Sequence, residues 1–132
     1  MPKNKLQATL EQYIGKWVNR LGISDYTVYA ELCSSKELNG DYAHVQTDED
    51  TRIVNLQFNR QRLLKEPNEI EKTVVHELLH TRLNEYCELV DEMIKLNAGN
   101  PKLQRVLEQR AEKLEHKIIV ALTDAIMETQ EN

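Results

Sequence analysis

Hydrophobic residues recur every three or four positions near the start of the chain, across residues 6–21. This spacing places them on one face of an α-helix, so we expect an amphipathic helix that ends at Gly22, a residue type typical of helix C-termini. The single tryptophan lies within this apolar stripe, which predicts a core position for it. The stripe consists of Leu6, Leu10, Tyr13, Ile14, Trp17, Val18 and Leu21.

The pattern then changes to alternation with β-branched and aromatic residues, which predicts strands. Residues 26–32 form the first such stretch. Residues 42–46 and 53–58 flank a polar turn at 47–52, so they predict a hairpin and a small sheet of three strands. The acidic run Asp48-Glu49-Asp50 lacks the glycine and the distal glutamate of a calcium loop, which favours a solvated turn.

Helical spacing returns after Pro67 and continues to about residue 96, with a bend or break expected past Leu83. Asn68 and Glu71 have the spacing of a capping box at the start of this helix. The stretch 97–101 contains Gly99 and Pro101 and should reverse the chain into a last helix over residues 102–128. The fold class is therefore α+β: an N-terminal helix, a small three-stranded sheet and two long helices in a single domain, 1–132.

Composition and charge narrow the class of protein. A net charge of −5 argues against a phosphate-binding surface, so we expect no nucleic-acid partner. No apolar run reaches the length of a membrane span, and the first residues lack the apolar stretch of a secretory signal. We therefore expect a cytoplasmic protein, with Cys33 and Cys87 as buried reduced thiols.

The most informative stretch is His76-Glu77-Leu78-Leu79-His80. Residues i and i+4 share one face of a helix about 5–6 Å apart, so the two imidazoles can share one Zn²⁺. Glu77 is rotated about 100° from His76, which lets it act as a general base without ligating the metal. The surrounding helix is apolar over most of its circumference. A metal would satisfy its narrow polar stripe, which comprises Thr73, His76, Glu77, His80 and Asn84.

A zinc site needs a third protein ligand, and the last helix offers one. If the loop centred on Gly99 folds two unbroken helices into an antiparallel pair, His80 lies level with about residue 118. Glu115 falls on the edge of the expected buried arc, whereas Glu112 and His116 point further out. That arc consists of Leu103, Leu107, Ala111, Leu114, Ile118, Ala121, Leu122 and Ala125. The alternative is that Glu115 is an interfacial charge paired with Lys72 or Arg82.

The His-Glu-x-x-His helix, followed by Glu115 on the next helix, resembles the gluzincins, and more narrowly the small minigluzincin-like metallopeptidases of phages and prophages. The resemblance implies His76, His80 and Glu115 as zinc ligands and Glu77 as the base. It also implies that a substrate pairs with an edge strand beside the cleft, here residues 53–58. Tyr42, Tyr86 and His116 are the candidates for stabilising the oxyanion, while His44 is expected to be an ordinary half-exposed histidine.

The sequence thus predicts a zinc-dependent endopeptidase, a hydrolase that cleaves a peptide bond in an extended segment docked on a sheet edge. Two alternatives stay open. One is a catalytically weak or inactive, zinc-bound phage regulatory module that binds a protein through the same groove. The other is a helical structural protein without metal. The pattern leaves the oligomeric state open.

Overall fold

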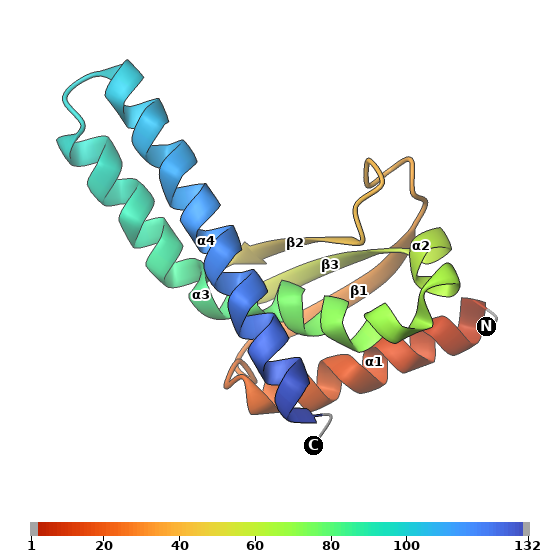
Figure 1. Cartoon of the computed structure of the whole chain (residues 1–132). Coiled ribbons are helices and arrows are strands. Elements are labelled where there is room, and N and C mark those ends of the chain that lie inside the picture. The colour runs from red at the N-terminus through yellow and green to blue at the C-terminus, as the bar shows by residue number, and fades with distance from the viewer. Residues whose placement is uncertain (1–2, 131–132) are drawn as a thin grey trace. The chain divides into compact units, whose positions relative to one another are not determined.

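The computed structural model describes residues 3–130, which form two compact units, one ending at Arg82 and one beginning at Leu83. The architecture is α+β, as predicted: an N-terminal helix, a small mixed sheet and then long helices (Figure 1). The elements are α1 (Lys3–Arg20), β1 (Thr27–Cys33), β2 (Ala43–Asp48), β3 (Ile53–Asn59), α2 (Arg60–Lys65), a 3₁₀ turn (Pro67–Glu69), α3 (Ile70–Asn97) and α4 (Pro101–Gln130).

Helix α1 follows the predicted apolar stripe. It ends at Arg20, and Gly22 adopts a φ of 71°, a left-handed conformation that glycine reaches without steric cost. Trp17 is buried, which confirms its expected place in the core. The first unit therefore begins with a helix whose apolar side is covered.

The predicted three strands are present, but their order in the sheet is β1-β3-β2. Strand β3 pairs in parallel with β1 and antiparallel with β2. The assignment of residues 53–58 to an edge strand was therefore wrong, because hydrogen bonds occupy both sides of β3. The edges of the sheet are β1 and β2.

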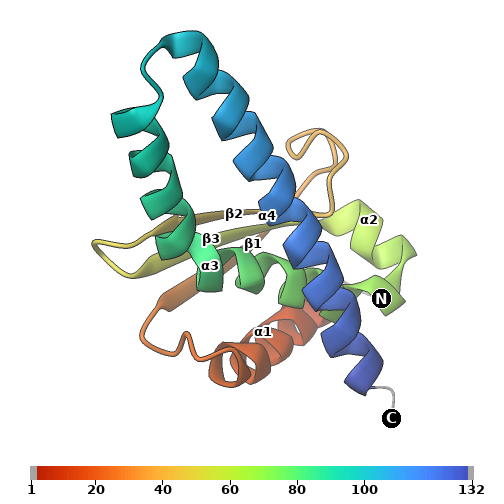
Figure 2. The same cartoon turned by 60° about the vertical axis from the view of Figure 1, so that its left-hand side comes forward.

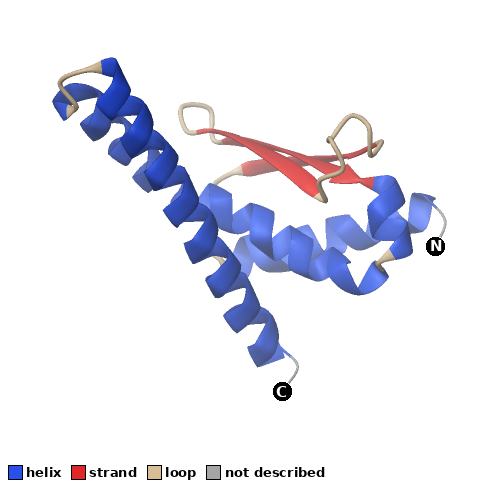
Figure 3. Cartoon of the chain, turned by 45° about the horizontal axis from the view of Figure 1, so that its top comes forward, coloured by secondary structure: helices blue, strands red, loops and turns tan. Residues whose placement is uncertain are grey.

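One face of this sheet packs against helices. Figure 3 shows α1 and the first part of α3 on the same side of the strands. Successive side chains of a strand point to opposite faces, so alternate residues of β3 reach these helices. The fully buried side chains of this core include Leu6, Leu10, Val54, Leu56, Phe58, Val74 and Leu78.

Helix α2 and the 3₁₀ turn were not foreseen from the sequence. Six residues are too few to show the period of a helix, so the only feature of the sequence that indicates α2 is the residue that caps its N-terminus. The Oδ1 atom of Asn59 accepts a hydrogen bond from the backbone N–H of Arg62 at 3.0 Å, and Asn59 itself is fully buried. A buried asparagine can thus begin a helix directly at the end of a strand.

Glu71 does not serve as the capping residue expected from the sequence. Its Oε2 atom instead accepts hydrogen bonds from Lys16 Nζ at 2.8 Å and from Trp17 Nε1 at 3.0 Å. Burial opposes ionisation of this carboxyl, but the bonds from Lys16 and Trp17 outweigh it and lower the pKa of Glu71. The interaction links α3 to α1.

The second unit is a helical hairpin formed by the last part of α3 and by α4 (Figures 1 and 2). Gly99 lies in the loop with a φ of 78°, as a sharp reversal requires. Of the bend or break expected past Leu83, the break is absent, because α3 is one continuous helix from Ile70 to Asn97.

The buried arc predicted for α4 was largely wrong. Leu103, Leu114, Ile118 and Leu122 are all more than 40% exposed. The less exposed line along the middle of this helix includes Leu107, Ala111 and Glu115. Apolar residues cover a wide arc of α4. Their positions around the helix therefore do not by themselves decide which of them pack against α3.

Within the described part of the chain, no helix is both long enough and apolar enough to cross a bilayer.

Replacing Glu71 with glutamine should destabilise the protein by about 1 kcal/mol at pH 7, since the variant loses the charge that pairs with Lys16. A carboxyl whose pKa is lower in the folded than in the unfolded state stabilises the fold at any pH above its unfolded-state pKa. This stabilisation is lost as the pH falls through the folded-state pKa. Urea unfolding at pH 7 and pH 3 should therefore show a gap between wild type and Glu71→Gln at pH 7 that shrinks at pH 3. A gap of equal size at both pH values would contradict the ion pair.

Candidate functional site

Helix α3 presents the two histidines of the motif together. The ring centroids of His76 and His80 lie 5.2 Å apart with an interplanar angle of 66°. Both side chains are half-buried. The spacing confirms that the motif is helical and that both imidazoles lie on one face. Two rings at this separation suit two adjacent positions of a tetrahedral zinc site.

Glu77 is almost fully buried beside this pair, with 8% of its surface exposed. Burial, followed by the negative charge of Asp41, raises the pKa of Glu77 to about 8. Folding therefore favours the protonated form of this carboxyl. A nearby divalent cation would favour the carboxylate, which is the form that a general base needs.

Strand β2 lies beside the motif helix. Thr47 Oγ1 and Thr81 Oγ1 are 3.1 Å apart, and Thr81 directly follows His80. Asp41 precedes the strand, and its backbone carbonyl accepts a hydrogen bond from Asn59 Nδ2 at 3.0 Å. Neither Asp41 nor Thr81 was identified from the sequence, because a single loop acid and a helical threonine carry no pattern that points to a site.

The pairing of β2 leaves part of its backbone directed away from the sheet. The N–H of Asn59 donates to the carbonyl of Tyr42, so every second residue of β2 from that point is in a hydrogen-bonded pair with β3. The backbone N–H and C=O groups of His44 and Gln46 therefore face β3. Those of Ala43, Val45 and Thr47 point away from the sheet. An extended peptide could pair with this outward side.

Glu115, the predicted third ligand, belongs to the second unit and has a partner there. Its Oε1 atom accepts a hydrogen bond from Cys87 Sγ at 2.9 Å. Burial, followed by this bond and the charge of Glu115, raises the pKa of the Cys87 thiol to about 12. Glu112 and His116 are exposed, whereas Glu115 is half-buried.

The complete ligand set stays a prediction. Across residues 3–130, no three His, Cys, Asp or Glu side chains form a group that could hold a metal ion. The helix of the first unit supplies two imidazoles that fit zinc. The role of Glu115 as the third ligand is not tested by its contact with Cys87.

The other side chains considered from the sequence fall into ordinary environments. The hydroxyl of Tyr42 donates to Glu66 Oε1 at 2.9 Å, and Tyr86 is exposed. His44 is half-exposed, as expected, with its Nε2 atom 3.0 Å from Asp41 Oδ2. Cys33 is a buried free thiol, as predicted, and Cys87 is a half-buried one.

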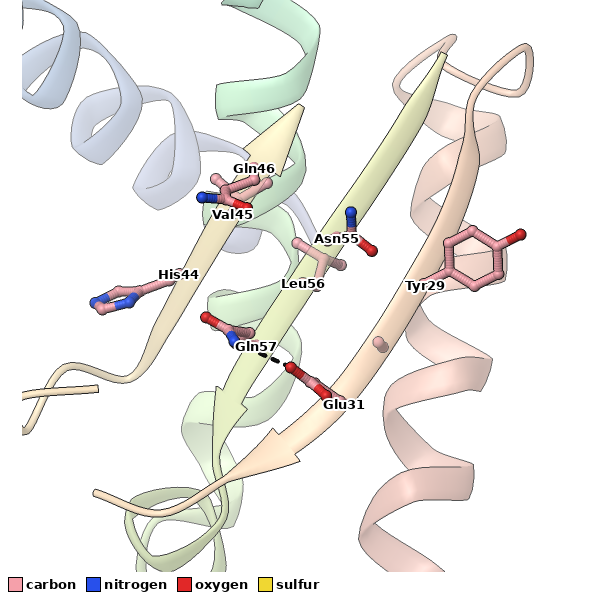
Figure 4. Close-up of a pocket in the computed structure, with 9 residues that line it drawn as sticks. Tyr29, Glu31, His44, Val45, Gln46, Asn55, Leu56 and Gln57 are labelled. Carbon is pink, nitrogen blue, oxygen red and sulfur yellow. Dashed lines mark hydrogen bonds between the residues drawn. The ribbon is translucent and has the colours of Figure 1, made fainter. Parts of the chain in front are cut away.

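A shallow hollow of about 280 Å³ lies over the strands rather than over the motif helix. Figure 4 shows its polar side chains projecting from the sheet with the helices behind. Within the hollow, Gln57 Nε2 donates to Glu31 Oε1 at 3.0 Å. The hollow lacks the motif residues, so it is separate from the candidate metal centre.

No protein-family model, curated protein or solved structure matches the chain. The resemblance to gluzincins therefore rests on the motif residues alone.

We expect the purified chain to bind one equivalent of zinc through His76, His80 and Glu115. His80→Ala should abolish binding, since it removes one of two imidazoles from the same face. Glu115→Ala should weaken zinc binding by about 10-fold or more. The matched control is Glu112→Ala, which changes an exposed glutamate on the same helix and should leave zinc binding unchanged. Metal analysis and competition with a zinc-sensitive dye give both values, and a stronger effect of Glu112→Ala would exclude Glu115 as the ligand.

Proposed function

We propose that the protein is a zinc-dependent endopeptidase. The observation that carries this proposal is the arrangement on α3, where His76 and His80 share a face beside the buried carboxyl of Glu77. The closeness of β2 supports it further, because a peptidase needs a backbone edge that holds an extended substrate near the reacting groups.

The proposed chemistry assigns a role to each motif residue. His76, His80 and Glu115 would hold the metal. When bound, zinc supplies Lewis acidity at the scissile carbonyl and lowers the pKa of its water toward about 7. Glu77 takes a proton from the attacking water and delivers it to the leaving amine, so that one side chain serves as base and then as acid. Burial of Glu77 keeps this carboxyl out of bulk solvent.

The proposed substrate is an extended or unfolded peptide segment that pairs with β2. This replaces the earlier assignment to residues 53–58, which lie in the centre of the sheet. The outward N–H and C=O groups of Val45 and its neighbours at alternate positions would supply main-chain hydrogen bonds. Such pairing recognises backbone rather than sequence, so specificity would be broad.

The alternative function is a zinc-bound module, of the kind that phages use for regulation, that binds a protein segment on the same edge without cleaving it. The outward backbone groups of β2 are consistent with this alternative, since binding an extended segment needs a free strand edge but no base. The following experiment separates the two functions.

Glu77→Gln should retain zinc and lose peptide hydrolysis by about 10²–10⁴-fold, because the amide keeps the shape of the side chain but cannot accept the proton. Cleavage of unfolded casein and of a quenched peptide library, measured beside zinc content, checks this. Equal hydrolysis by the two proteins with zinc bound would exclude Glu77 as the base. A wild type that binds these peptides without cleaving them would favour the binding module.

Val45→Pro should reduce kcat/KM for extended peptides by about 10-fold or more, since it removes one N–H that is directed away from β3 and fixes the backbone there. The control is Val45→Ala, which shortens the side chain but keeps the N–H and should be close to wild type. Circular dichroism should show that both variants fold. Equal losses in the two variants would show that β2 does not pair with the substrate.

A further inference from the structure

The hairpin of the second unit has an apolar face that its own two helices do not cover. On α3, Tyr86, Leu89, Met93 and Leu96 are each more than half exposed. Their spacing of three, four and three residues confines them to an arc of about 80° on the helix. The more protected residues of the same segment, Leu83, Cys87, Val90 and Ile94, lie on a different arc.

Helix α4 extends the same face. Leu103 and Leu114 lie within about 20° of one another, and both are more than 40% exposed. The bond between Cys87 and Glu115 marks the side of each helix that faces the other. Viewed from its own N-terminus, each helix carries its exposed stripe about 100–140° from that side, in the same direction. Because the two helices are antiparallel, these similar rotations place both stripes on the same side of the hairpin.

Charges of opposite sign border the two halves of this face. Along the outer margin of the α3 stripe the charged residues are acidic except for Lys95 near the loop, and along the outer margin of the α4 stripe they are basic. These are Glu85, Glu88 and Glu92 on α3, and Lys102, Arg110, Lys113 and Lys117 on α4.

The two rows also match in level. The 2.9 Å bond between Cys87 and Glu115 places these residues side by side. Five residues toward the loop from each are Glu92 and Arg110, and two residues in the other direction are Glu85 and Lys117. Glu92 and Glu85 therefore each have a basic counterpart at the same level, while Glu88 is level with Leu114 and one residue from Lys113.

We propose that this face binds a second copy of the chain, so that two hairpins form a four-helix bundle. A two-fold axis parallel to the helices sets α3 of one copy against α4 of the other at the same level. Glu92 then meets Arg110 of the second copy, Glu85 meets Lys117, and each pair occurs twice. The opposite arrangement, α3 against α3, would set like charges together and is disfavoured.

The full chain should sediment as a dimer, at twice the 15.4 kDa of one chain, over about 1–200 µM in analytical ultracentrifugation. Leu89→Lys should weaken dimerisation by at least about 100-fold, because it places a cation in the apolar face at the level of Lys113 of the second copy. The matched control is Val106→Lys. Val106 is 53% exposed against 52% for Leu89, but it lies between Lys102 and Arg110 in the basic row, so this variant should remain a dimer.

Charge reversal tests the register independently of the apolar contacts. Glu92→Lys and Arg110→Glu should each weaken the dimer by about 10-fold or more, and the double variant should recover most of the loss, since the pair re-forms with reversed signs. Three results would overturn the proposal. They are a wild type that is monomeric throughout, a Val106→Lys variant as disrupted as Leu89→Lys, or a double variant no tighter than either single one.

Discussion

The packing of the first part of α3 against the sheet is the constraint on which the first unit depends. This segment is apolar over most of its circumference, so it is stable only where a sheet and a second helix cover it. Its polar residues cannot reach solvent freely and must find partners within the protein. The buried environment of Glu77 and its raised pKa follow from this position. The same burial that stabilises the helix thus gives the motif carboxyl its unusual chemistry.

Much of the fold follows from periodicity in the sequence. The three long helices, β1 and the β2–β3 hairpin lie close to their predicted positions, because each spans several turns or several alternations. The order of the strands did not follow. Alternation identifies a strand and its buried face but says nothing about which neighbour pairs with it, so the central position of β3 required the structure. Helix α2 was missed because six residues do not establish a period.

The candidate site was predictable to a similar extent. His76, Glu77 and His80 could be identified because one helix fixes their mutual geometry, which the separation of the two rings bears out. Asp41 could not be, since its effect on Glu77 depends on a loop that approaches α3 only in the folded chain. The buried arc predicted for α4 was wrong because apolar residues form two lines along that helix. One lies against α3 in the hairpin, and the other remains on the surface.

The hydrogen bond from Trp17 to Glu71 gives the protein a built-in optical reporter. Trp17 is the only tryptophan in the chain, and its indole N–H is fixed to a carboxylate on α3 at 3.0 Å. Loss of the contact between α1 and α3 would expose the ring to water and shift its fluorescence. The second unit contains only tyrosine among the aromatic residues, at Tyr86. Tryptophan emission therefore follows the unfolding of residues 3–82 alone, while helical circular dichroism follows both units. Comparison of the two signals during denaturation measures directly whether the units unfold together.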